Sequence, residues 1–133
     1  MKPSQLEIHF DGNRDSYRPG EILSGEYRFD MSDTTDVVAL EVSVLWHTEG
    51  KGDEDISVHL FNRFDVSSTG THVPYHSGRF STQLPNSPLS YEGVIVKIRW
   101  CVRIRVFDGR GKDVVAERPF RLGLVAPARA VLP

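Results

Sequence analysis

The sequence predicts an all-β fold, an immunoglobulin-like antiparallel β-sandwich of about seven or eight strands. Three observations predict it: apolar residues alternate with polar ones at a period of two, clusters of turn residues separate these stretches, and no amphipathic helical pattern is present. Strands that are apolar on one face bury that face best when two sheets pack against each other.

The clearest alternation runs from Val94 to Val106, where every even position is apolar and most odd positions are basic. A strand places all even positions on one face, whereas a helix would scatter them around its axis. We therefore expect one long strand here, with its basic residues on the opposite face.

A tight turn at 108–111 follows this strand, and Gly111 suits its left-handed position. This loop length sets Asp108 opposite Lys112 and fixes the register of the return strand. The expected pairs are Val106 with Val114, Ile104 with Ala116, Arg103 with Glu117, Trp100 with Phe120, and Ile98 with Leu122. Arg118 is the exception, because this register places it on the apolar face beside Pro119. We expect an edge position or a bulge there.

A second hairpin is expected around the turn residues 49–53, with apolar alternation on both sides. If Thr48 lies opposite Glu54, the apolar residues that pair across this hairpin all lie on one face of the sheet. The expected pairs are Trp46 with Ile56, Val44 with Val58, and Val42 with Leu60.

Three shorter strands and three loops complete the expected domain. The strands are centred on Leu6, Ile8 and Phe10, on Leu23, Tyr27 and Phe29, and on Phe80, Thr82 and Leu84; the loops are 11–20, 67–78 and 85–90. We expect residues 1–123 to form one sandwich and residues 124–133 to form a C-terminal tail rich in Ala and Pro.

Composition excludes several classes of protein. The chain has 133 residues, 39% apolar and 26% charged, which fits one folded domain with one core. The formal charge of −2 gives no global attraction to nucleic acid or to an anionic membrane. Cys101 is the only cysteine, so an intrachain disulfide is excluded. Because we see no apolar leader segment and no membrane span, we expect a cytoplasmic protein.

Four segments, in order, resemble the N-terminal domain of the arrestin clan. They are Tyr17-Arg18-Pro19-Gly20-Glu21-Ile22-Leu23-Ser24-Gly25, then Phe80 to Pro85 with Pro88-Leu89-Ser90-Tyr91-Glu92-Gly93, then Ile98 to Val102, and Pro119-Phe120-Arg121-Leu122. Each segment also has a structural explanation: Pro19 and Gly20 suit a tight turn, and Gly93 suits a close backbone bend. The motifs therefore indicate a fold and not a site.

The resemblance implies a cytosolic adaptor or scaffold that binds proteins through a sheet edge, a concave face or loops. This chain departs from eukaryotic arrestins, which join two such domains and carry adjacent lysines in the first strand. Here the lysines are Lys2, Lys51, Lys97 and Lys112, and no PPxY peptide is present. The chain looks more like a stand-alone bacterial member, and phosphoreceptor recognition is not carried over.

The predicted partner-binding residues are Arg99, Arg103 and Arg105, which with Lys97 share one strand face and can form a basic stripe. The simpler interpretation is a solvated outer face on which Glu117 pairs with Arg103 and other acidic residues neutralise the remainder. Sequence reasoning favours that simpler interpretation.

Other chemistry is weaker. His72 and His76, with His59 or His47, resemble a metal set, but they lie among Gly, Pro and Ser without an adjacent carboxylate. Cys101 lies mid-strand without a neighbouring His, which is typical of a packing residue. The acidic turns at 53–55 and 30–36 lack the spacing of a calcium loop. We therefore predict no cofactor, no metal and no catalytic residue.

The sequence thus predicts a non-enzymatic adaptor or scaffold domain of arrestin-like fold that binds an unknown protein partner and no nucleic acid. Two alternatives stay open. One is a ligand- or metal-binding sandwich that uses the loop histidines. The other is a structural subunit that self-associates through its edge strands.

Overall fold

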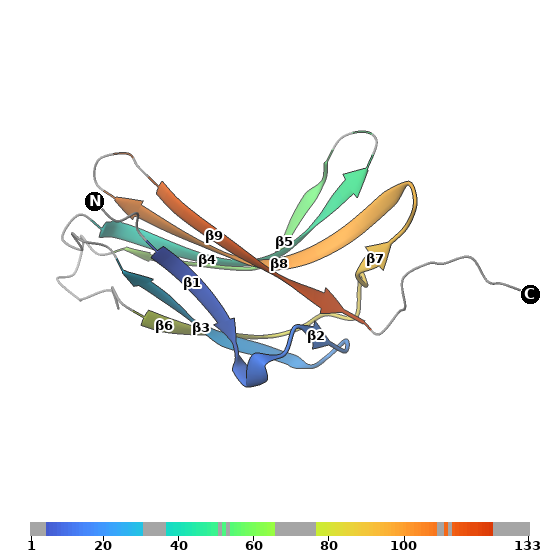
Figure 1. The fold of residues 1–133 in the computed structure, drawn as a ribbon, viewed down its shortest axis with the longest axis horizontal. Coiled ribbons are helices and arrows are strands. Elements are labelled where there is room, and N and C mark those ends of the chain that lie inside the picture. The colour runs from blue at the N-terminus through green and yellow to red at the C-terminus, as the bar shows by residue number, and fades with distance from the viewer. Residues whose placement is uncertain are drawn as a thin grey trace, which may run out of the picture.

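The computed structural model describes residues 5–30, 37–50, 52, 54–65, 77–108, 111 and 113–123, which form two β-sheets packed face to face (Figure 1). Their strands are β1 (Gln5–Phe10), β2 (Ser16–Tyr17), β3 (Ile22–Asp30), β4 (Val37–Gly50), β5 (Ile56–Asp65), β6 (Ser77–Gln83), β7 (Tyr91–Glu92), β8 (Val96–Asp108) and β9 (Asp113–Leu122). The helical element of these ranges is a single 3₁₀ turn, η1 (Asp11–Asn13). The predicted all-β sandwich is confirmed, with β2 and β7 as two-residue additions to the longer strands.

The two sheets differ in size. The smaller sheet has the order β1-β3-β6, and the larger one has the order β2-β9-β8-β4-β5 with β7 added beside β8. All pairings are antiparallel except β2 with β9, which is parallel. The predicted antiparallel sandwich is therefore confirmed, and β2 adds one short parallel pairing where the chain crosses from the small sheet to the free side of β9.

The register predicted for β8 and β9 is confirmed from Val106–Val114 through Trp100–Phe120. Gly111 has the expected left-handed backbone, with φ of 82°. Asp108 and Lys112 cannot be compared, because Lys112 lies outside the described residues. The strand itself begins at Val96, two residues later than predicted, and Val94 is fully exposed beyond its end.

The predicted pair of Ile98 with Leu122 is wrong because the segment before β8 takes the place of β9. Ile98 pairs with Tyr91 of β7. Leu122 instead exchanges two hydrogen bonds with Ser90: the Ser90 N–H donates to the Leu122 carbonyl at 2.8 Å, and the Leu122 N–H donates to Ser90 Oγ at 2.8 Å. The end of β9 therefore separates from β8, and residues 90–92 fill the gap.

The predicted register of β4 and β5 is also wrong. Thr48 lies opposite Asp55 and not Glu54, since the Thr48 N–H donates to the Asp55 carbonyl at 3.0 Å. Val58 consequently lies opposite Leu45. A β-bulge then shifts the register so that Val44 faces Leu60, and His59 is the extra residue.

The core lies between the sheets and contains a cluster of aromatic rings. Phe10, Tyr17, Phe80 and Phe120 make edge-to-face contacts with ring centroids 5.8 to 6.3 Å apart. Trp100 is 1% exposed, and its indole N–H donates to the Pro88 carbonyl at 2.8 Å. Trp46 packs against the same cluster, so both tryptophans face inward as predicted.

One polar side chain joins the two sheets on each flank of the sandwich. On the β9 side, Arg118 donates to the Ile8 carbonyl at 2.8 Å and lies over the Phe10 ring at 4.8 Å. On the β5 side, His59 Nε2 lies 2.9 Å from the Gln83 carbonyl oxygen. The sequence predicted either an edge position or a bulge at Arg118. Arg118 lies on the edge strand β9, and the register of β8 with β9 has no bulge there.

The predicted loops are partly correct. Segment 11–20 contains η1 and β2, and Ser77 and Gly78 belong to β6, while 67–76 lie outside the described residues. The ends of β4, β5 and β8 that lead into the β4–β5 and β7–β8 turns rise away from the small sheet (Figure 1). In the described part of the chain, no helix has the length and apolar character needed to cross a membrane.

Candidate functional site

Arg99, Arg103 and Arg105 lie on the outer face of the large sheet, the face that points away from the small sheet. Each forms an ion pair with an acidic side chain of a neighbouring strand. The pairs are Arg99 with Glu49 at 3.0 Å, Arg103 with Glu117 at 2.6 Å, and Arg105 with Asp113 at 2.7 Å. An anionic ligand would have to displace these carboxylates.

Glu92 of β7 extends the same network. It lies 3.8 Å from the Lys97 ammonium and 3.4 Å from the Arg99 guanidinium. Hydrogen bonds from His47 and Arg99 hold the pKa of Glu49 below its usual value. The basic residues singled out from the sequence therefore belong to a charge-balanced surface.

An apolar row crosses the middle of this outer face. It consists of Val58 on β5, Leu45 on β4, Cys101 on β8 and Pro119 on β9, each paired with the next. Leu45 is 1% exposed and Cys101 is 4% exposed although both point away from the core. We call these four residues the outer apolar row.

Both ends of the row, Val58 and Pro119, are exposed, and further exposed apolar residues adjoin the β5 end. Val58 is 52% exposed, and its neighbours along the same face of β5, Ile56 and Phe61, are 56% and 51% exposed. At the opposite end, an open hollow of about 560 Å³ lies over Cys101 and Pro119. His47, Glu49, Arg99 and Glu117 contribute to its lining. The surface thus combines an apolar centre with a rim of paired charges.

Cys101 forms part of the floor of this hollow as a packing residue. Burial, and to a smaller extent the nearby Glu117 carboxylate, raise the pKa of its thiol to about 11, while Arg103 opposes the rise. Its sulfur lies 4.0 Å from Glu117 Oε2. Because the thiolate is the nucleophilic form, a thiol with this pKa is a poor nucleophile near neutral pH.

The described histidines are already engaged in contacts within the domain. His47 Nε2 lies 3.1 Å from Glu49 Oε1, and His59 bonds to β6. His72 and His76 lie outside the described residues, as do Asp33, Asp36 and Asp53. The ranges that the structure describes contain no cluster of three His, Cys, Asp or Glu side chains suited to a metal ion.

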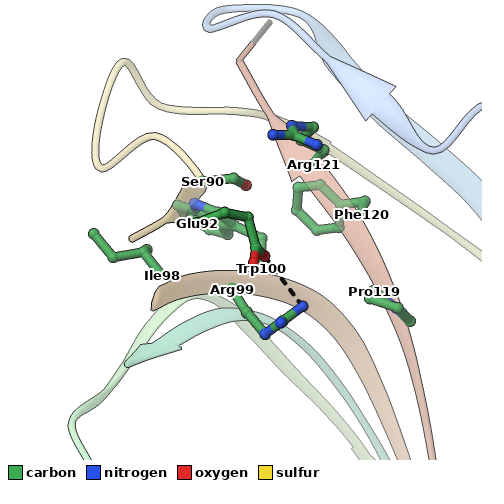
Figure 2. A pocket seen from close by; sticks show the side chains of 8 residues that line it. All are labelled: Ser90, Glu92, Ile98, Arg99, Trp100, Pro119, Phe120 and Arg121. Atoms are coloured by element: carbon green, nitrogen blue, oxygen red, sulfur yellow. Dashed lines mark ion pairs between the residues drawn. The ribbon is translucent and has the colours of Figure 1, made fainter. Parts of the chain in front are cut away.

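A smaller cavity of about 140 Å³ lies where β9 separates from β8 (Figure 2). Trp100 and Phe120 are among its lining residues, together with Ser90, and the Arg99–Glu92 ion pair lies beside it. This volume is that of a few water molecules, so the cavity suits ordered water or one side chain better than a metabolite.

Sequence reasoning missed the outer apolar row. The strands around Leu45 and Cys101 were interpreted from their apolar even positions. The available signal was that these two residues are apolar although they occupy odd positions, which face outward. Val58 was assigned to the core-facing side by the incorrect register of β5.

The fold is that of an arrestin-like β-sandwich. No family model and no curated protein matches the chain. Among solved structures, the chain is similar to Spo0M, a sporulation control protein from Bacillus subtilis whose fold is arrestin-like, with a TM-score of 0.60 and 14% sequence identity. The match covers 92% of this chain and 50% of Spo0M, so the chain spans about half the length of that protein. At this identity, the likeness extends to the fold alone.

Proposed function

We propose that this chain is a non-enzymatic, protein-binding domain of the arrestin clan, and that its partner binds over the outer apolar row. The observation that carries the proposal is the row itself, which crosses four strands and ends in exposed apolar residues on β5. The side chains that a partner would remove from water are those at the β5 end, because Ile56, Val58 and Phe61 are about half exposed. Leu45 and Cys101 are already buried.

The chemistry of the surrounding surface favours a protein as that partner. An apolar centre enclosed by arginines and acidic residues matches the usual anatomy of protein interfaces. The arginines are already paired with carboxylates, which disfavours nucleic acid or a phosphate as the main ligand. In this proposal Arg99, Arg103 and Arg105 orient the partner at the rim.

Two features support a role without catalysis. The raised pKa of Cys101 leaves the thiol protonated, and the described histidines are held in contacts within the domain. The buried free thiol of Cys101 also agrees with the expected cytoplasmic location, which stays a prediction.

The test is a pull-down from native lysate that compares wild type with Val58→Lys. This change places a charge on the exposed end of the row without removing a core side chain, and we expect recovery of the partner to fall at least tenfold. The matched control is Ile22→Lys on the small sheet, because Ile22 is 53% exposed against 52% for Val58. Circular dichroism checks that both variants fold.

A partner that is recovered equally with Val58→Lys and wild type would contradict the proposed surface. Loss of the partner with both variants would show that the effect comes from added charge and not from the row.

A further inference from the structure

Strand β5 is a long, exposed edge of the large sheet. It pairs only with β4 within the described ranges, and nine of its ten residues are exposed, Leu60 being the exception. It contains no proline and no lysine, and Phe61 and Phe64 are 51% and 42% exposed. Edge strands with these properties present unpaired backbone groups to any other strand of suitable sequence.

The neighbouring edges of the sandwich are protected in ways that β5 is not. The edge of β9 carries Pro119, which has no N–H to donate, and its far end pairs with β2. On β1, the Ile8 carbonyl accepts a hydrogen bond from Arg118. On β6, the Gln83 carbonyl accepts one from His59.

We propose that β5 binds the β5 strand of a second copy of this chain, antiparallel, with Asn62 on the two-fold axis. This pairing places Leu60 opposite Phe64 of the second copy and Phe61 opposite Arg63 of the second copy. Both pairs stay on one face of the sheet, because Phe61 and Arg63 point outward while Leu60 and Phe64 point to the other side. The two large sheets then join into one.

Charge favours this register over the two adjacent symmetric ones. Centring the axis on Arg63 would place two guanidinium groups opposite each other, and centring it on Phe61 would place Arg63 opposite His59. Centring it on Asn62 gives Arg63 an aromatic ring instead, a favourable cation–π neighbour of the kind that Arg63 already has in Phe107, at 5.0 Å. The small net charge of −2 adds little repulsion between copies.

This dimer is independent of the proposed partner site. Pairing uses the backbone edge of β5 and leaves the outer apolar row open on both copies. A second copy and a heterologous partner can therefore bind together, and each interaction can fail without the other.

The test uses Asn62→Cys in the full chain under mild oxidation. Residues directly opposite in an antiparallel pair have Cβ atoms about 4.5 to 5.5 Å apart, so two cysteines on the axis can form a disulfide with a small adjustment. Cys101 gives little background because it is 4% exposed. The matched control is Val115→Cys, on β9 and 49% exposed.

We expect light scattering of wild type at about 100 µM to give the molar mass of a dimer. On a non-reducing gel, we expect Asn62→Cys to run as a covalent dimer and Val115→Cys to run as a monomer. In a second variant, Phe61→Lys places an ammonium opposite Arg63 and should weaken the wild-type dimer at least tenfold while the chain stays folded. A monomeric wild type, or equal cross-linking of both cysteine variants, would overturn the inference. Capture of another protein's strand by a monomeric chain would overturn it as well.

Discussion

Arg118 lies on the core-facing side of β9, where the alternating pattern calls for an apolar residue. It is accommodated because its guanidinium reaches the Ile8 carbonyl of the other sheet and stacks on Phe10. A bulge is unnecessary, since the edge position leaves the side chain room to cross between sheets. Arg118 therefore links β9 of the large sheet to β1 of the small sheet, on a flank where no backbone pairing between the described strands connects the two sheets.

Replacing Arg118 with Met keeps an unbranched apolar stem but removes this link. We expect the free energy of unfolding in urea to fall by about 1 to 3 kcal/mol, the range for a hydrogen bond to a charged donor and its unsatisfied partner. The control is Arg28→Met, which removes an exposed ion pair with Glu26 and should cost less than about 1 kcal/mol. Equal effects of the two substitutions would contradict the inter-sheet role of Arg118.

Glu21 is the residue that stabilises the turn leading into β3. Its carboxylate accepts a hydrogen bond from the Arg14 guanidinium at 3.0 Å and from the Arg18 N–H at 2.7 Å. Both hold the pKa of Glu21 below its usual value of 4.5. The stabilisation from this carboxylate is therefore complete above about pH 4.5 and is lost as the pH falls through the lower pKa of the folded state.

We therefore expect Glu21→Gln to be less stable than wild type at about pH 7, and the difference to shrink as the pH falls below 4.5. Urea unfolding at a series of pH values measures this difference. Glu54→Gln, at the exposed β4–β5 turn, serves as the control and should show no such narrowing. A gap for Glu21→Gln that stays constant with pH would indicate a packing effect and not the charge.

At the scale of elements, two hairpins show why one register was predicted correctly and the other was not. The loop after β8 has Gly111 with a left-handed backbone, and this fixes the count of residues across the turn. The β4–β5 turn has several residues that suit a turn, so the count across it is ambiguous by one. A shift of one residue moves Val58 from the core-facing side to the outer face.

The β-bulge at His59 explains how the chain tolerates that shift. It restores Leu60 to the core while Val58 stays outside. The bulge also turns the His59 side chain toward β6 and against Trp100. The centroids of the His59 and Trp100 rings lie 6.2 Å apart. Alternation alone predicts that strands exist here, but it carries no information on a bulge, because both registers bury similar residues.

At the scale of the whole molecule, the alternation of residues was sufficient to predict two packed sheets. The outer apolar row was not predictable in the same way, because its four residues lie on four strands. Predicting that they are neighbours requires all three registers between those strands. Arg99, Arg103 and Arg105 were found because they lie on one strand, whereas their acidic partners belong to neighbouring ones.

The face-to-face packing of the sheets leaves the outer face of the large sheet free to bind. The small sheet covers the inner side of the large one, and the outer face carries the apolar row, its rim of paired charges and the exposed side chains of Ile56 and Phe61 on β5. Binding at this face together with pairing of β5 would give a symmetric module with two equivalent partner sites.

Site-specific photo-crosslinking in the native cell tests the central claim most directly. A photoreactive amino acid at position 58 should form a reproducible covalent adduct with one protein partner, and the same amino acid at position 22 should not. Val58 and Ile22 are matched in exposure, at 52% and 53%, so the comparison isolates the face of the molecule. Adducts from position 22 alone, or the same adducts from both positions, would contradict binding over the outer apolar row.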